Sequence, residues 1–113
     1  MERLAAEGWI DDLAAARSAV RTRGTRYGRA RLSRELEARG FSSDTISEAF
    51  AGEGADDREE IALHRAFERL WRARPGLPAP VRRRRVFDAL TRRGFSVEKI
   101  SEIIRSRYEV DRS

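Results

Sequence analysis

Apolar residues recur along the chain at the three- and four-residue spacing of α-helices, and no stretch alternates as strands do. Near the beginning, Leu13, Ala16 and Val20 fall on one face of a helix that is expected over about 11–23. The same spacing, with glycine and proline between the apolar runs, predicts helices over about 27–39, 43–51, 57–73, 80–93 and 97–108. The predicted fold class is therefore all-α.

The sequence contains an internal repeat with an offset of 54 residues. Residues 40–48 (GFSSDTISE) align with residues 94–102 (GFSVEKISE), and six of the nine positions are identical. Upstream, Arg31, Leu36 and Arg39 align with Arg85, Leu90 and Arg93. The repeat predicts two tandem copies of a three-helix unit, of the size expected for helical repeats. The expected organisation is a remnant of a preceding repeat at 1–9, repeats at 10–52 and 57–108, a linker at 53–56 and a flexible tail at 109–113.

The repeated segment predicts a tight corner between two helices. In the first copy, Gly40 takes the left-handed conformation that ends a helix, and Phe41 folds back onto Leu36. Ser42 then caps the next helix, whose Ile46 packs on the same Phe41 ring. The second copy repeats this corner with Leu90, Gly94, Phe95, Ser96 and Ile100.

The composition limits the core and excludes several classes of site. Leu, Ile, Val and Phe together number 24 of 113 residues and Ala numbers 16, so the expected core is small and built from closely packed helices. The absence of Cys excludes a disulfide framework, a thiolate zinc site and a cysteine nucleophile. No apolar run is long enough for a membrane span, and the first residues do not resemble a signal peptide. We expect a soluble, cytoplasmic, monomeric protein.

No candidate active site emerges from the sequence. The acidic pairs Asp11–Asp12 and Asp56–Asp57 are expected at helix starts, where carboxylates favour the helix dipole. His64, the single histidine, has no nucleophile or carboxylate pattern around it. Trp9 and Trp71 are interpreted as packing residues rather than base-stacking platforms. We therefore expect no catalytic residue, no metal site and no cofactor.

Arginine is the strongest functional signal, in a chain with a formal net charge of +5. Residues 17–39 hold eight arginines against two carboxylates, and residues 69–93 hold nine against one. The four-residue run 82–85 is interpreted as functional, because adjacent like charges repel unless a partner neutralises them. The candidate residues for binding a partner or DNA are Arg31, Arg34, Arg39, Arg82, Arg84, Arg85, Arg92 and Arg93.

The order of several short motifs is similar to that in the RecX family, which regulates bacterial recombination. Residues 8–12 (GWIDD), 15–17 (AAR), Tyr27–Gly28, Leu32 and the segments 35–36 and 39–40 resemble the second unit of that family. Residues 92–96 (RRGFS), followed by Ile100, resemble its third unit. The resemblance covers about residues 4–108.

The resemblance implies a non-enzymatic regulator of DNA repair, recombination and the SOS response. Family members are elongated arrays that bind along the groove of the RecA recombinase filament. They inhibit its ATPase, strand-exchange and co-protease activities, and some also contact DNA. The positions that match exposed basic positions of the family are Arg31, Arg39, Arg85, Arg92 and Arg93.

Two departures from the family pattern bear on function. Family members usually carry three units, whereas this chain holds two and a fragment, so we expect fewer contacts along the groove. Ala15 replaces an aromatic residue that is common in the second unit, which thins the core. Two alternatives stay open: a basic helical module that binds DNA directly, and a structural adaptor without a DNA partner.

Overall fold

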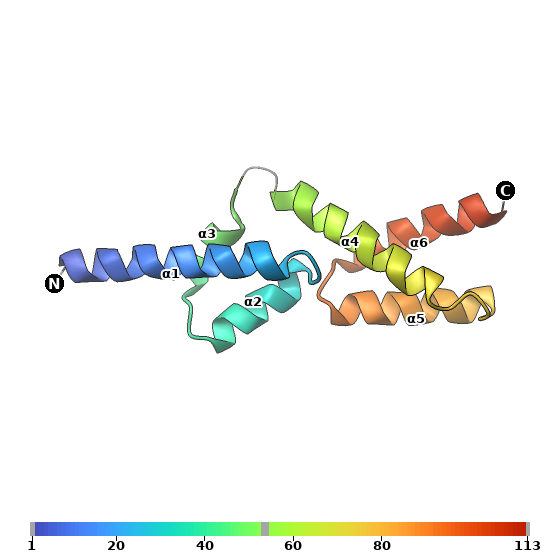
Figure 1. The fold of residues 1–113 in the computed structure, drawn as a ribbon, viewed down its shortest axis with the longest axis horizontal. Helices are drawn as coiled ribbons and strands as arrows, with labels where there is room; N and C mark the ends of the chain where they lie inside the picture. Colours follow the sequence, from blue (N-terminus) through green and yellow to red (C-terminus); the bar gives the residue numbers. More distant parts are fainter. Residues whose placement is uncertain (1, 53–54, 113) are drawn as a thin grey trace.

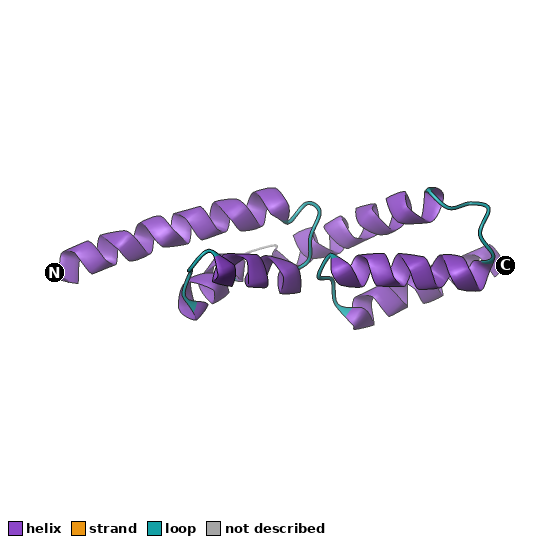
Figure 2. Cartoon of the chain, turned by 90° about the horizontal axis from the view of Figure 1, so that it is seen from below, coloured by secondary structure: helices purple, strands orange, loops and turns teal. Residues whose placement is uncertain are grey.

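The structure is a computed structural model that describes residues 2–52 and 55–112. Over these residues the chain folds into helices and forms no strand (Figures 1 and 2). The helices are α1 (Glu2–Arg23), α2 (Arg29–Ala38), α3 (Ser43–Phe50), α4 (Ala55–Arg72), α5 (Ala79–Arg92) and α6 (Val97–Arg112). The prediction of an all-α array of three-helix repeats is confirmed.

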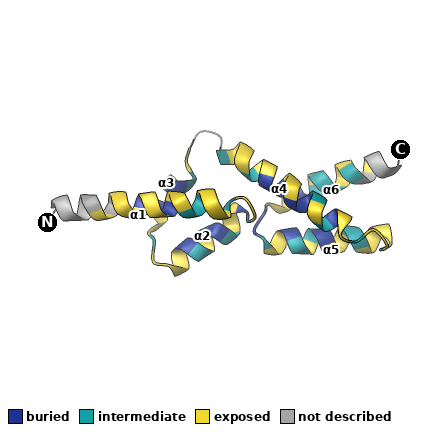
Figure 3. Cartoon of the chain, in the orientation of Figure 1, coloured by how far each residue is buried: buried dark blue, intermediate teal, exposed yellow. Residues whose placement is uncertain are grey.

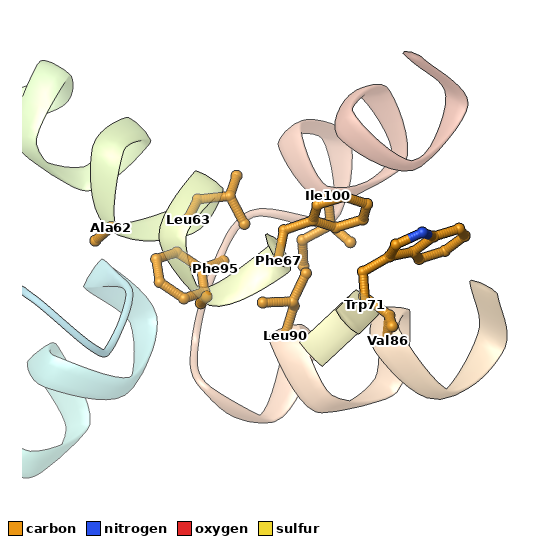
Figure 4. Close-up of a cluster of buried hydrophobic side chains, with 9 residues drawn as sticks. Ala62, Leu63, Phe67, Trp71, Val86, Leu90, Phe95 and Ile100 are labelled. Atoms are coloured by element: carbon orange, nitrogen blue, oxygen red, sulfur yellow. The ribbon is translucent and has the colours of Figure 1, made fainter. Parts of the chain in front are cut away.

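Each set of three helices has its own hydrophobic core. In the first repeat, α1, α2 and α3 enclose Leu13, Ala16, Leu36, Ile46 and Ala49. In the second repeat, large side chains of α4, α5 and α6 meet in the cluster drawn in Figure 4. Buried residues therefore form two patches rather than one continuous core (Figure 3).

Aromatic packing anchors the core of the second repeat. Phe67 and Trp71 lie one turn apart on α4, and their rings stack with centroids 5.4 Å apart (Figure 4). Both are buried against Leu90 and Ile100, neither of which is exposed to solvent. The position of Trp71 in the core agrees with the packing role expected from the sequence.

The two repeats lie end to end. The molecule measures 63 × 25 × 19 Å, and its radius of gyration of 17.3 Å exceeds the roughly 13 Å expected of a compact chain of this length. The elongation follows from the separate cores, because neither repeat contributes a large apolar face to the other.

Both corners have the backbone of a Schellman helix ending. Gly40 and Gly94 have φ of +94° and +89°, the left-handed region that glycine adopts without a steric penalty. The amide of Phe41 donates to the carbonyl of Leu36 at 3.1 Å, and that of Phe95 donates to Leu90 at 3.3 Å. This backbone places each phenylalanine in the core cluster of its own repeat.

The Gly94 corner also joins the repeats, because it receives the beginning of α2. The amide of Gly28 donates to the carbonyl of Arg93 at 2.7 Å, and that of Ala30 donates to Gly94 at 3.2 Å. Gly28 is the N-cap of α2 and has no side chain to cap it, so these carbonyls occupy the place of a capping oxygen. The C-terminal end of α5 thus meets the N-terminal end of α2, a favourable alignment of helix dipoles (Figure 2). We call this contact the junction.

The expected start of the first helix was wrong. A single helix runs through Gly8, so Asp11 and Asp12 lie inside α1 and cap nothing. An exposed glycine costs a helix interior only about 1 kcal/mol, and the good helix formers around it offset that cost. Helix α4 begins at Ala55, two residues before the expected start, and α6 continues to Arg112, four residues beyond the expected end. The assignments of a linker and a tail stay predictions.

Parts of the expected domain organisation lie outside the described residues. Residues 53–54 of the linker, residue 1 of the expected remnant and residue 113 of the tail are among them, as is the side chain of Trp9. The assignment of residues 1–9 to a preceding repeat stays a prediction.

Candidate functional site: a basic face on α5

Helix α5 concentrates the positive charge of the chain. It holds five arginines against one carboxylate, Asp88. Val86 and Leu90 face the core, so residues on the other side of the helix point outward. Arg84, Arg85 and Arg92 are exposed there, and we call these three residues the basic face.

Asp88 interrupts the basic face. It is exposed and lies one helical turn from each of Arg84, Arg85 and Arg92. Its negative charge lowers the local positive potential. Neutralising Asp88 should therefore make the basic face more positive, which is the opposite of what replacing an arginine does.

Arg82 belongs to the same run of arginines but points inward. Its Nε donates to the carbonyl oxygen of Trp71 at 3.0 Å, and its Nη2 donates to the same oxygen. The guanidinium also lies 4.1 Å from the centre of the Trp71 ring. Arg82 thus ties the first turn of α5 to the C-terminal end of α4. This internal partner accounts for one member of the run of like charges.

A shallow groove borders the basic face, between α5 and α6. It has a volume of about 470 Å³, with Phe87, Ser101 and Ile104 among its lining residues. Three arginines also line it: Arg83, Arg84 and Arg105. Arg83 and Arg105 were not among the candidates, because a sequence pattern does not show that α6 places a basic residue beside the run 82–85.

The candidate residues of the first repeat have different surroundings. Arg31 is half-buried: its Nη1 donates to the carbonyl of Arg92 at 3.5 Å, and its guanidinium lies 4.2 Å from the Tyr27 ring centre. Arg39 is exposed and lies over the Phe41 ring at 5.4 Å. Arg34 is exposed on the outer side of α2. Arg31 therefore belongs to the junction, whereas Arg34 and Arg39 face solvent.

Glu35 organises the charges beside the junction. Arg23 binds it in a bidentate pair, with N···O distances of 2.7 and 2.8 Å, and the Nε of Arg31 approaches it at 3.3 Å. The hydrogen bonds from Arg23 lower the pKa of Glu35 below its usual value, and those from Arg31 add to the effect. The same pair raises the pKa of Arg23.

Arg93 is half-buried, and its carbonyl oxygen accepts the Gly28 amide. Of the eight candidates, the structure brings Arg84, Arg85 and Arg92 together on one face. It places Arg31, Arg82 and Arg93 where they hold the repeats and helices in position. Arg34 and Arg39 lie on the other repeat.

The exposed arginines of the basic face suit binding of a negatively charged surface. The described residues contain no group of three histidine, cysteine or carboxylate side chains that could hold a metal ion. His64 is exposed on α4 and belongs to no catalytic constellation in the described part of the chain. No helix among the described residues is both long and apolar enough to cross a bilayer.

Comparisons with family models and with curated proteins both match RecX proteins. A family model described as "RecX, second three-helix domain" matches residues 11–49. A regulatory protein RecX from Chromobacterium violaceum is 37% identical over 106 residues, which cover 92% of this chain and 64% of the relative. A regulatory protein RecX from Xanthomonas campestris pv. campestris (strain B100) is 43% identical over 105 residues, 88% of this chain and 60% of the relative.

A more distant relative matches nearly the whole chain. The regulatory protein RecX from Thermobifida fusca is 33% identical over 113 residues, 98% of this chain and 60% of the relative. The chain spans about three fifths of the length of these curated relatives. The comparison with solved structures gives no match. These relatives are named as regulatory proteins and not as enzymes. The chain belongs to the RecX family.

Proposed function

We propose that this chain binds the RecA recombinase filament and inhibits its ATPase, strand-exchange and co-protease activities. The observation that carries the proposal is the basic face of α5, displayed on a rod 63 Å long. A filament is a repeating surface that includes bound nucleic acid and acidic protein side chains. A rigid basic rod can contact successive subunits and oppose the movements that accompany ATP turnover.

Hydrogen bonds at both ends of α5 support this proposal. Arg82 holds the beginning of the helix to α4, and the carbonyls of Arg93 and Gly94 hold its end to α2. The basic face is therefore fixed along the rod axis, so that binding loses little conformational entropy.

The alternative is direct binding of DNA through the same arginines. A helix–turn–helix protein presents its second helix to the major groove. Here the second helices of the two corners are α3 and α6, and their first turns carry Asp44 and Glu98. Because carboxylates at these positions repel phosphates, groove insertion is disfavoured, and DNA contact would fall to the basic face.

The test is a titration of this protein into a recombinase that hydrolyses ATP on single-stranded DNA. The variant is Arg85→Glu with Arg92→Glu, and the matched control is Arg26→Glu with Arg69→Glu. The control residues are exposed and lie outside α5. Each double variant replaces two arginines with two glutamates, so the two variants have the same net charge. We expect the α5 variant to need at least about tenfold more protein for half-inhibition, equivalent to about 1.4 kcal/mol. The control should inhibit like the wild type.

Binding to bare DNA in the same buffer separates the alternatives. Inhibition at concentrations that leave bare DNA unbound supports a filament regulator. Tight DNA binding without inhibition supports the DNA module, with affinity falling by about 0.9 log units per tenfold salt for each phosphate contact. Equal inhibition by both folded double variants would remove the basic face from the interface.

A further inference from the structure

A second concave surface lies between the two repeats. This groove of about 510 Å³ is lined by the C-terminal part of α1, the loop to α2, the first turn of α2, the end of α3 and the first turns of α4. Figure 1 shows where these helices lie, at the middle of the molecule between the two repeats. Its volume falls in the range of about 300–1,000 Å³ that is typical of ligand sites. No residue of α5 lines it, so it is separate from the basic face.

The lining of this inter-repeat groove includes apolar side chains from both repeats. The first repeat contributes Val20, Leu32 and Phe50, and the second contributes Ile61 and Ala62. Ile61 is 51% exposed although it is one of the largest apolar residues of α4. An exposed isoleucine beside half-buried Val20 and Phe50 forms an apolar contact area that a partner side chain could cover.

The rim of the groove is charged, with arginine in excess. Among the described residues, five arginines line the groove against the two carboxylates of Asp56 and Glu59: Arg17, Arg21, Arg29, Arg58 and Arg65. Both carboxylates lie on α4, whereas Arg17 and Arg21 project from α1 one turn apart. Arg17 lies 3.8 Å from a carboxylate oxygen of Glu48, but both side chains of this pair are exposed and such a pair is weak. The α1 side of the groove therefore still complements negative charge.

The aromatic rings of the groove favour a peptide over nucleic acid. The guanidinium of Arg29 lies 4.9 Å from the centre of the Phe50 ring. Tyr27 has Arg23 at 4.8 Å and Arg31 at 4.2 Å from its ring centre. Base binding favours open aromatic faces in an uninterrupted basic groove, whereas arginines already contact these two rings and the carboxylates of Asp56 and Glu59 interrupt the basic rim.

We propose that the inter-repeat groove binds an acidic peptide segment of a partner protein. A bulky apolar side chain of the peptide sits between Phe50 and Ile61, and neighbouring carboxylates face Arg17 and Arg21. Because the groove joins two repeats, an occupant contacts both and stabilises their relative orientation. This site is independent of the proposed inhibition of the filament through α5.

The test uses fluorescein-labelled synthetic peptides of equal length. The first peptide carries Leu-Phe beside four glutamates; the second replaces Leu-Phe with two serines; the third replaces the glutamates with glutamines. Labelled oligo-dT of similar length is the nucleic-acid probe. Fluorescence anisotropy gives the affinities, and amide NMR shifts of the protein show where the first peptide binds. We expect the first peptide to bind at least about tenfold tighter than either of the others.

Two variants and one control locate the site. Ile61→Ser removes the exposed apolar group, and Arg21→Glu reverses charge on the α1 side; each is expected to weaken the first peptide about tenfold. Arg85→Glu, on the basic face, should bind it within about twofold of the wild type, since reversing a distant, screened charge changes affinity little. Circular dichroism checks that all three variants keep their helicity.

Three outcomes would overturn the proposal. One is a first peptide that binds no better than the serine or glutamine peptides. Another is a loss of binding in Arg85→Glu as large as in Arg21→Glu, which would indicate a nonspecific charge effect. The third is oligo-dT binding that moves the amide signals of the groove more than the peptide does. None of these outcomes bears on inhibition of the recombinase, which is measured separately.

Discussion

Gly28→Ala tests whether the junction holds the two repeats in line. A Cβ at this position would lie 2.4 Å from the carbonyl oxygen of Gly94 and 2.6 Å from the backbone nitrogen of Phe95. The φ of Gly28 is −85°, which alanine adopts without strain. The clash involves backbone atoms that no rotamer change can move. The methyl group must therefore push the end of α5 away from the beginning of α2.

The size of the effect follows from the hydrogen bonds that the clash breaks. The Gly28–Arg93 and Ala30–Gly94 bonds, at 2.7 and 3.2 Å, each contribute about 0.5–1.5 kcal/mol. Their loss should destabilise the junction by about 1–3 kcal/mol, while each repeat keeps its own core. Alanine is also a poorer N-cap than glycine. Gly28→Ser separates these causes, because serine is a good cap but brings the same Cβ.

The assay is the distance between labels on the two repeats. Because the sequence holds no Cys, Ser18→Cys and Arg69→Cys provide one exposed labelling site in each repeat. Fluorescence energy transfer should show a broader distance distribution for both Gly28→Ala and Gly28→Ser, with helicity retained. Gly8→Ala, where a Cβ meets no atom within 4 Å, should leave the distribution unchanged. Unchanged distances and stability in both Gly28 variants would refute the junction as the coupling element.

Three further experiments test individual contacts. Arg23 lowers the pKa of Glu35, so this pair stabilises the fold above the ordinary glutamate pKa of about 4.3, and its contribution is lost as pH falls through the lowered pKa. In urea unfolding measured at several pH values, the free energy of unfolding should therefore fall less steeply at acid pH for Glu35→Gln than for the wild type. The hydroxyl of Ser42 accepts the Thr45 amide at 3.2 Å, and Ser42→Ala should cost about 1 kcal/mol in chemical denaturation, with little change for exposed Ser47→Ala. Asp88→Asn should lower the concentration for half-inhibition of the recombinase roughly threefold, because it removes the carboxylate within the basic face.

The corners were predictable because their chemistry is local. Glycine ends the helix, phenylalanine returns to the helix just left, and serine begins the next one, all within about seven residues. The internal repeat reinforced this interpretation, since the same residue types recur at the same spacing. The expected helices therefore agree with α2, α3, α5 and much of α6 to within a few residues.

The junction was not predictable, because its acceptors are backbone carbonyls more than sixty residues away. In sequence, Gly28 is only a weak helix cap, and Gly94 only a helix-ending glycine. Nothing local distinguishes Gly94 from Gly40, although a Cβ on Gly94 would meet Arg31 at 2.4 Å and one on Gly40 would meet no atom within 4 Å. The second role of Gly94 arises from tertiary contact alone.

The run of arginines shows a similar limit. Arg82 and Arg85 have the same chemistry and lie three residues apart, yet one binds the Trp71 carbonyl and the other faces solvent. The directions of the two side chains on α5 follow from helical geometry. Whether Arg82 meets the Trp71 carbonyl depends on how the loop after α4 turns the chain so that α5 packs beside α4. The charge pattern predicted two basic stretches, and the structure adds that Arg82 has an internal partner whereas Arg85 is exposed.

The junction and the basic face are mechanically linked, because both belong to α5. Under the proposed function, the rod must hold its contacts with a repeating filament at a fixed spacing, since a binding module that pivots loses the advantage of multiple contacts. The carbonyls of Arg93 and Gly94 would set that spacing, because they fix α2 and its exposed Arg34 relative to α5. Opening the junction should therefore weaken filament inhibition even though it leaves every exposed arginine in place. Gly28→Ser in the ATPase titration distinguishes this geometric requirement from a simple requirement for positive charge.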